Sequence, residues 1–319
     1  MDDSQRVGSA ADPAATVRNV LGAGCVRYVP GDDTAMKEAA AWAARHATEL
    51  EVTLRVLGDR PGQPGEDLLF RDELRRHRWI TADAAPRLTD DGVLALEALN
   101  RYIAADHTAE TRSFLNASAA IDESSRVLDV GCSTGRLLLS LAPRGPHRMV
   151  GVDIDLFALH LAAVGAHAAG RAARWCCASA LDLPFPDGAF THALSFVTLN
   201  AVPVRAALAE LERVLEDDGQ LILTVEGHGY WLRQLRLGST ARRLHLVVRE
   251  LPCNIALPLF DWQKLAPLQR VSMRVAISRR ALTRMLEEAG FALERCEVLR
   301  REQGVAWLIG VAARKRRRR

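Results

Sequence analysis

Residues 126–140, with the sequence RVLDVGCSTGRLLLS, decide the fold of this 319-residue chain. Residues 127–130 form an apolar run broken by a single aspartate, and the run is short enough for a buried parallel strand. The turn Gly-Cys-Ser-Thr-Gly follows, and a run of leucines after it predicts a helix. A strand, a glycine turn and a helix bring backbone N–H groups close to a ligand at the end of a sheet. We expect Gly131 and Gly135 to permit the close approach of this ligand, which a Cβ would block.

Strand and helix patterns alternate along the chain after this stretch. The predicted strands are residues 148–152, 174–177, 191–196 and 219–226, and the predicted helices are residues 156–169 and 203–215. Such alternation favours an α/β fold with a doubly wound, mostly parallel sheet and helices on both faces. Ser278 is a suitable N-cap for another helix, which Gly290 ends. Residues 291–299 and 304–312 then predict an antiparallel hairpin at the sheet edge.

The N-terminal third is organised differently. Residues 1–33 are weakly patterned and predict a disordered leader; they begin acidic and lack the leucine-rich core of a secretory signal. Residues 34–120 predict a helical domain, with a basic helix at 68–79 and the motif LTDDG at 88–92. This order is similar to a winged-helix fragment, but the motif is short and common, and a plain helical cap is the favoured interpretation. We therefore divide the chain into the leader, this domain, a main domain at 121–313 and a basic tail at 314–319.

Composition narrows the class of protein. The chain is 49% hydrophobic and 25% charged, which is ordinary for a globular protein, and it has no apolar run long enough for a membrane span. Its six cysteines form no CxxC pair and no zinc-like cluster, so we expect reduced thiols, no metal and a cytoplasmic location. The formal charge is +3, and without the six basic residues at 314–319 it would be −3. A terminal basic run can bind nucleic acid or anionic lipid, although most such runs are solvated tails.

Five sequence motifs, in order, resemble the class I S-adenosylmethionine-dependent methyltransferases, and most of all the group of small-molecule enzymes typified by quinone biosynthesis. The motifs are VLDVGCSTGRLL, VGVDID, ASALDLPFPDGAF with ALSFVTLNAV, LAELERVLEDDGQLILTVE, and SRRALTRMLEEAGF. They cover residues 126–226 and 278–312. A lone glycine turn is weak evidence, but five motifs in order are specific. The resemblance implies a Rossmann-like, seven-stranded fold with S-adenosylmethionine as the cofactor.

The resemblance also implies how the first part of the cofactor is bound. Asp129 would order the loop or accept a hydrogen bond from the cofactor's ammonium group. The loop backbone would pack against the methionine part, through Gly131, Cys132, Ser133 and Gly135. Asp153, at the end of the second strand, would accept hydrogen bonds from both ribose hydroxyls, as the acidic residue does in dinucleotide-binding folds.

Further residues would surround the rest of the cofactor. Ile154 would stack beside the adenine ring. The residues implied at the adenine edge are Ser179, Ala180 and Leu181. Ser195 and Phe196 would close the methionine side.

This sequence departs from the family pattern at three positions. Ser133 replaces the middle glycine of the turn, which raises local crowding. Ser179 stands where many relatives have an aspartate, so a hydroxyl replaces a charged contact to the adenine amine. Thr191 replaces another common aspartate. We expect these changes to weaken the cofactor site without abolishing it.

The acceptor side of the site is less well specified. Since the sulfonium methyl is already activated, the protein needs to supply alignment and sometimes a base. His228 is the candidate base, although an isolated loop histidine is more often a binding or structural residue. Asn200, Glu226 and Tyr230 are candidate substrate contacts, because they also follow the ends of predicted strands. Glu226 could instead cap a helix.

The segment after the fifth predicted strand, residues 227–277, predicts a lid. Residues 244–251 predict an amphipathic basic helix, which would suit an acidic or phosphorylated apolar substrate, or pack on the core with its arginines in water. The basic residues of residues 228–280 are Arg233, Arg236, Arg242, Arg243, Arg249, Lys264, Arg270, Arg274, Arg279 and Arg280.

We expect methyl transfer to oxygen, nitrogen or carbon of a small, partly apolar metabolite, and a homodimer is compatible with this. Two alternatives stay open: an RNA- or protein-directed methyltransferase that uses the basic insert and tail, and a non-catalytic scaffold that binds the cofactor. The chain lacks the [DNS]PP[YFW] loop of amino-directed nucleic-acid enzymes, which disfavours that class. Pro252-Cys253 lies in the wrong place for the catalytic pair of cytosine-C5 enzymes.

Overall fold

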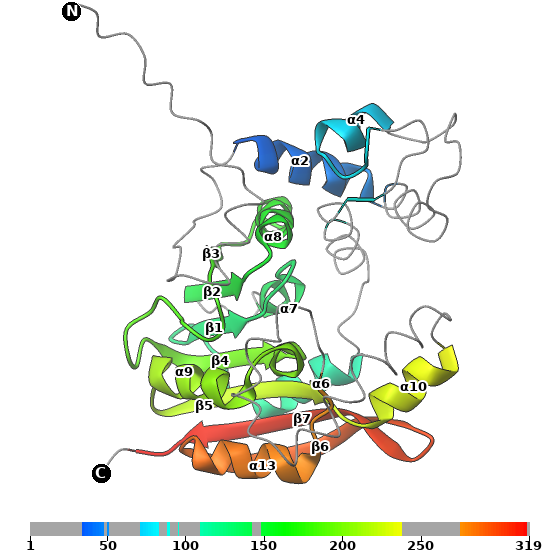
Figure 1. Ribbon diagram of the computed structural model, residues 1–319. Helices are drawn as coiled ribbons and strands as arrows, with labels where there is room; N and C mark the ends of the chain where they lie inside the picture. Colours follow the sequence, from blue (N-terminus) through cyan, green and yellow to red (C-terminus); the bar gives the residue numbers. More distant parts are fainter. Residues whose placement is uncertain are drawn as a thin grey trace, which may run out of the picture.

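Seven strands form one sheet in the order β3-β2-β1-β4-β5-β7-β6 (Figure 1). The computed structural model describes residues 34–47, 50, 71–82, 88–89, 95, 109–141, 148–237 and 275–317. The strands are β1 Arg126–Val130, β2 Arg148–Asp153, β3 Arg174–Cys177, β4 Phe190–Phe196, β5 Leu215–Glu226, β6 Phe291–Glu302 and β7 Val305–Lys315. The leader at 1–33 and the helix expected at 244–251 lie outside the described residues.

The sheet is parallel except at one end. β1 pairs with β2 and β4, β2 with β3, and β4 with β5, all in parallel, whereas β7 pairs in the antiparallel sense with β5 and β6. The doubly wound α/β fold and the terminal hairpin predicted from the sequence are therefore confirmed. β5 begins at Leu215, four residues before the predicted start, and a register shift between Phe190 and His192 of β4 accommodates the extra length.

Helices cover both faces of the sheet. The helices are α2 Thr34–Arg45, α4 Arg71–Arg76, α6 Ala109–Ser118, α7 Arg136–Ser140, α8 Leu156–Ala168, η2 Thr198–Ala201, α9 Val204–Val214, α10 Gly229–Leu237 and α13 Arg279–Glu288. α9 and α13 pack on one face of the sheet, and α6, α7 and α8 pack on the other. Each strand of the central sheet is thus buried on both sides, which explains the nearly continuous apolar runs in its sequence.

Local signals in the sequence fix where several helices begin. Ser278 accepts a hydrogen bond from the backbone N–H of Ala281, as its predicted N-cap role requires. Asp155 caps α8 in the same way by accepting from Ala158. Pro203 precedes α9, where its missing N–H is not needed.

The described N-terminal helices lie beyond β3 and pack on α8, at the end of the molecule opposite the hairpin (Figure 1). Ala40 of α2 meets Ala158 and Leu161 of α8, so small side chains allow the two helices to approach closely. Trp79 packs edge-on against Phe157 of α8, with the ring centroids 5.2 Å apart. These contacts join the N-terminal segment to the helix that follows β2.

Two of the residues expected in the basic tail at 314–319 belong to the sheet instead. β7 runs through Arg314 and Lys315, because Arg314 pairs with Gln220 of β5 in register. The Arg314 side chain forms an ion pair with Glu294, and Arg317 forms one with Asp218. Hydrogen bonds and nearby carboxylates of the fold, rather than solvent alone, therefore hold this part of the run.

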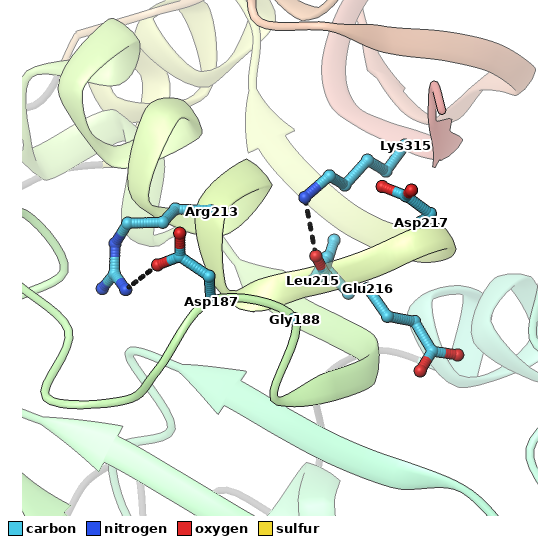
Figure 2. Close-up of a pocket in the computed structure, with 7 residues that line it drawn as sticks. All are labelled: Asp187, Gly188, Arg213, Leu215, Glu216, Asp217 and Lys315. Carbon is cyan, nitrogen blue, oxygen red and sulfur yellow. Dashed lines mark hydrogen bonds and ion pairs between the residues drawn. The ribbon is translucent and has the colours of Figure 1, made fainter. Parts of the chain in front are cut away.

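Lys315 closes the C-terminal end of α9. The residue is 6% exposed, and its ammonium donates to the backbone carbonyls of Glu212 and Leu215, both at 2.8 Å. Lys315 lines a cavity of about 330 Å³ at the amino edge of the parallel strands. Figure 2 shows Lys315 on one side of this cavity and the ion pair between Arg213 and Asp187 on the other. A cation at this position stabilises a helix, since the final carbonyls carry partial negative charge.

The described helices are all too short or too polar to cross a membrane. The four cysteines in the described regions are free thiols: Cys132, Cys176, Cys177 and Cys296.

Replacing Lys315 by methionine should destabilise the protein by about 1–3 kcal/mol, because two buried carbonyls would lose their donor. The measurement is the free energy of unfolding in denaturant. Arg316→Met is the matched control, since the Arg316 side chain is exposed. Within the described part of the chain, its hydrogen bond is made by the backbone N–H, which donates to the carbonyl of Gly290 and is kept in the variant. Equal losses in the two variants would contradict the role assigned to Lys315.

Candidate functional site

The candidate site lies at the carboxyl ends of β1 and β4. The chain runs from β1 to β2 and β3 in one direction, and β4 then pairs on the other side of β1. In an open α/β sheet the crevice at such a reversal binds ligands. The glycine turn at 131–135 connects β1 to α7 in this crevice, as the sequence predicts.

The end of β2 holds this loop in place. The backbone N–H groups of Gly131 and Cys132 both donate to the carbonyl of Val152, at 2.7 and 3.0 Å. The N–H of Ser133 donates to Oδ2 of Asp153 at 2.8 Å. The second carboxylate oxygen of Asp153, Oδ1, accepts from the N–H of Asp155 at 2.9 Å. Asp153 therefore orders the loop in addition to any contact with a ligand.

The two glycines of the turn have a packing role that the sequence did not predict. Gly131 and Gly135 have φ angles of 77° and 69°, which favour glycine. A Cβ on Gly131 would lie 1.9 Å from Oγ1 of Thr198, and one on Gly135 would lie 2.2 Å from the Trp175 ring. The space that the missing Cβ leaves is thus filled by the protein's own side chains, and the glycines let the loop pack on β3 and η2.

Two polar side chains at the loop are left without hydrogen bonds by the described residues. Asp129 is 2% exposed, and burial, followed by repulsion from Asp153, raises its pKa from 3.8 to about 7. The hydroxyl of Ser133 is buried and has no partner, and this residue has a φ of 48°. A non-glycine residue in this conformation is uncommon and is often found where function requires it. Both groups suit a ligand that supplies hydrogen-bond donors and positive charge.

Burial also raises the pKa of the neighbouring Cys132 thiol well above its usual value, so this cysteine stays neutral. Among the described groups, the only hydrogen-bond acceptor of its Sγ is the backbone carbonyl of Ser133, at 3.7 Å. Cys132 therefore contributes to the loop through its backbone and its volume, and not as a charged thiolate.

The crevice has an apolar margin at the ends of β2 and β3. Ile154 is 46% exposed and Leu181 is 37% exposed, although large apolar side chains in this fold are mostly buried. Ala180 is buried beside them, and the Ser179 hydroxyl accepts a hydrogen bond from the N–H of Leu181. Exposed apolar side chains next to an acidic residue can bind a ligand that has a flat apolar ring and hydroxyl groups.

The end of β4 differs from the expectation. Ser195 is fully buried and its hydroxyl has no hydrogen-bond partner among the described residues, and Phe196 is also buried, so both side chains are covered at this end of the strand. Val197 follows with a φ of 62°, a strained conformation for a β-branched residue. Its N–H donates to the carbonyl of Thr224 on β5 at 2.9 Å. The strain marks the place where β4 ends at the crevice, and no signal in the sequence predicted it.

Asn200 is a structural link rather than the expected substrate contact. Its Nδ2 donates to the carbonyls of Glu226 and Val275, at 2.9 and 2.5 Å, and its Oδ1 accepts from the N–H of Glu226 at 2.8 Å. The residue is 1% exposed. The amide group is therefore occupied by backbone, and it ties η2 to the end of β5 and to the segment that precedes α13.

The other candidates follow β5 closely. Glu226 is 8% exposed at the last position of the strand, and the exposed His228 lies just before α10. Tyr230 is buried in an apolar cluster with Trp231, Ala276 and Trp307. The structure thus brings His228 to the carboxyl edge of the sheet with its side chain accessible, while Tyr230 is largely covered.

Comparisons with known proteins agree with this arrangement. The family described as "Methyltransferase domain" matches residues 127–219. A demethylmenaquinone methyltransferase of Thermus thermophilus is 41% identical over 100 residues, which cover 31% of this chain and 46% of that protein. A ubiquinone/menaquinone biosynthesis C-methyltransferase of Citrifermentans bemidjiense is 31% identical over 132 residues, which cover 40% of this chain and 56% of that protein. The chain spans about half the length of these curated relatives.

A solved structure shares the fold. It is a chain from the complex between the Haloferax volcanii Trm112 methyltransferase activator and a methyltransferase, with a TM-score of 0.52 and 15% sequence identity. The match covers 72% of this chain and 96% of that chain. At this identity the likeness extends to the fold alone.

The raised pKa of Asp129 predicts how stability depends on pH. The folded protein keeps the Asp129 proton up to about pH 7, whereas the unfolded chain releases it near 3.8. The unfolding free energy of the unliganded wild type, relative to Asp129→Asn, should therefore fall as pH rises between these values and stop changing above about pH 7. Denaturant unfolding at several pH values measures this difference.

Asp122→Asn is the control for this experiment. Hydrogen bonds from Ser124 and Ser125 lower the pKa of the exposed Asp122, so its contribution is lost only as pH falls below the usual aspartate range. Its difference from wild type should stay constant where that of Asp129→Asn changes. A constant difference for Asp129→Asn as well would contradict the buried, protonated state.

Proposed function

We propose that this chain, whose residues 127–219 belong to the class I S-adenosylmethionine-dependent methyltransferase family, transfers a methyl group from S-adenosylmethionine to a small-molecule acceptor. One observation carries the proposal: the family match covers the same residues that form the crevice, with Asp153 holding the loop at its centre. When bound, S-adenosylmethionine supplies a methyl group that its sulfonium has already activated. The chain's own residues then have to bind the cofactor and the acceptor, align the attacking atom with the methyl group, and remove a proton from the acceptor where the reaction requires it.

Asp153 and the apolar margin would hold the nucleoside part. Each carboxylate oxygen accepts two hydrogen bonds, and the loop and α8 use one on each. The remaining lone pairs can accept from the two ribose hydroxyls. Ile154 and Leu181 are both exposed and would cover the adenine ring, with Ser179 and Ala180 at its edge.

Asp129 and the loop would hold the methionine part. The cofactor carries positive charge on its sulfonium and ammonium groups, and Asp129 is a buried acid without a hydrogen bond from the described residues. A nearby cation favours the ionised carboxylate. The Ser133 hydroxyl, also buried and unpartnered, would complete this half with the backbone of Cys132 and Gly135.

His228 is the proposed base for acceptors that must lose a proton. It is exposed immediately after β5, at the same edge of the sheet as the loop. Direct displacement needs the attacking atom in line with the methyl group, so most of the acceleration would come from alignment. We assign Glu226 to the acceptor side as well, and Tyr230 to the apolar cluster that would lie next to the acceptor.

The relatives favour a small, partly apolar ring as the acceptor, because their names refer to demethylmenaquinone and to ubiquinone and menaquinone biosynthesis. The RNA- or protein-directed alternative has less support, since ion pairs within the fold engage Arg314 and Arg317 of the basic run. We also propose that the domain at 34–120 is a cap on the cofactor side, as α2 packs on the helix that follows Asp153.

Asp153→Asn should weaken S-adenosylhomocysteine binding about 10- to 100-fold, because an amide cannot accept on both oxygens as a carboxylate does. Calorimetric titration measures the affinity. Asp155→Asn removes a charge two residues away but keeps the helix cap, so its affinity should stay close to that of the wild type. Equal affinity in Asp153→Asn and the wild type, or no binding to the wild type, would overturn the proposal.

His228→Gln should lower kcat for a naphthoquinol acceptor about 100-fold while leaving S-adenosylhomocysteine affinity unchanged, since the residue acts on the acceptor and not on the cofactor. His167→Gln is the control, because His167 is an exposed histidine at the far end of α8. Unchanged kcat in His228→Gln would end its candidacy as the base.

A further inference from the structure

An indole with two arginines lies beside the end of β5. Trp307 of β7 accepts a hydrogen bond from the N–H of Gly227 through its backbone carbonyl, at 2.8 Å. The guanidinium carbon of Arg233, on α10, is 4.7 Å from the centre of its ring, and that of Arg300, on β6, is 5.1 Å from it. We call Trp307, Arg233 and Arg300 the indole platform. Figure 1 shows α10 beside the β6–β7 hairpin, at the carboxyl edge where His228 also lies.

The arginines around the platform differ in their partners. Arg300 forms an ion pair with Glu110 at 2.9 Å, and Arg236, one turn after Arg233, forms one with Glu302 at 2.9 Å. Arg233 is half-buried, and its guanidinium stacks on the Trp307 ring. Among the residues that the structure describes, it forms no ion pair and no side-chain hydrogen bond. Stacking uses the face of a guanidinium and leaves the N–H groups at its edge free to donate.

A second donor at the same place also lacks an acceptor. Nε1 of Trp307 is buried and has no hydrogen-bond partner in the described structure. An indole N–H can only donate, and a guanidinium can only donate. Unpaired donors of this kind are costly to bury, and the group that satisfies both must be an acceptor. An anionic oxygen is the strongest such acceptor.

We propose that Arg233 and Trp307 bind an anionic group, a carboxylate or a phosphate, on the methyl acceptor. This rests on the function proposed above, because the platform follows β5 at the edge of the sheet where the acceptor would lie. The charge of Arg300 is already neutralised by its ion pair with Glu110, so we assign Arg300 to holding the Trp307 ring in place, on which its guanidinium stacks. The acceptor is then an acidic molecule with an apolar body, and this body would lie beside the apolar cluster that contains Trp231 and Tyr230.

The sheet sets the length of such an acceptor. From β1, which leads into the cofactor loop, to β7, which carries Trp307, there are three neighbour steps through β4 and β5. At about 4.8 Å for each step, the loop and the platform are about 14 Å apart across the sheet. A fused aromatic ring system with an acidic substituent at one end is long enough to place its other end toward the loop.

The test uses the full chain saturated with S-adenosylhomocysteine and three probes: a hydroxynaphthoate, the matching naphthol without the carboxylate, and a naphthyl phosphate. Calorimetry should show that the wild type binds at least one anionic probe about tenfold or more tightly than the naphthol, as expected for a charge-assisted pair. Arg233→Gln should remove this preference. Comparison of the two anionic probes identifies which anion the site prefers.

Arg236→Gln is the matched control, because it removes an arginine from the same helix that Glu302 already pairs. It should keep the preference. Trp307→Phe, which keeps a ring for stacking but removes the N–H, should reduce it severalfold, and Arg233→Lys should retain only part of it. Loss of the preference in Arg236→Gln to the same extent as in Arg233→Gln, an absent preference in the wild type, or no binding of any probe would overturn the proposal.

The outcomes also separate this proposal from the proposed function. Every variant is first titrated with S-adenosylhomocysteine, and its affinity should be unchanged because the platform does not contact the loop. Normal cofactor affinity without anion preference would refute the anion site alone. Failure of the wild type to bind S-adenosylhomocysteine would refute the methyltransferase function instead.

Discussion

The hydrogen bonds between the end of β2 and the loop after β1 determine the shape of the candidate site. The Val152 carbonyl accepts from two successive N–H groups of the loop, and Asp153 accepts from a third. Three donors that would otherwise be unpaired at the end of β1 are thereby satisfied before any ligand arrives. Gly151 makes this possible, because a Cβ there would lie 2.8 Å from Sγ of Cys132 and 2.6 Å from the Trp175 ring.

This anchoring brings two acidic side chains to the same crevice. Asp129 lies beneath the loop and Asp153 beside it, and their repulsion adds to burial in raising the pKa of Asp129. A cationic ligand would reverse that effect, since a positive charge favours the ionised form. In the unliganded site, a negative charge on Asp129 is therefore unfavourable. In a site that holds a cationic ligand, the ligand's positive charge would compensate it. A neutral nucleotide-like ligand without positive charge would gain much less.

The sequence predicts the parts of the fold that depend on local patterns. The apolar run before Gly131, the Ser278 cap and Pro203 each determine an element through the chemistry of a few neighbouring residues. Contacts between distant residues could not be predicted in this way. Asn200 has its amide bonded to Glu226 and Val275, which are 26 and 75 positions away. Likewise, Lys315 bonds carbonyls about 100 positions earlier, so the first two residues of a basic run that looks like a tail in the sequence are part of a strand.

The role of the glycines shows the same limit. A pattern with Gly131 and Gly135 predicts a tight turn, and the positive φ angles confirm it. What fills the space above each glycine depends on where Thr198 and Trp175 lie, and these residues come from η2 and β3. The motif alone could not distinguish a ligand from a packed side chain. The strain at Val197 was similarly hidden, because it arises where β4, η2 and β5 meet.

The two edges of the sheet differ in how completely their polar groups are paired. At the amino edge, Lys315 and Arg213 are bonded to carbonyls and carboxylates. At the carboxyl edge, Asp129, the Ser133 hydroxyl, Arg233 and the Trp307 N–H have no hydrogen-bond partner among the described residues. Because unpaired buried groups lower stability, a fold keeps them where a ligand completes them. The acidic Asp129 lies in β1, and the unpaired donors of Arg233 and Trp307 lie at or beside β7. The part of this edge near β1 therefore suits a positively charged group, and the part near β7 suits a negatively charged one. One cationic cofactor and one anionic acceptor, side by side, would satisfy both.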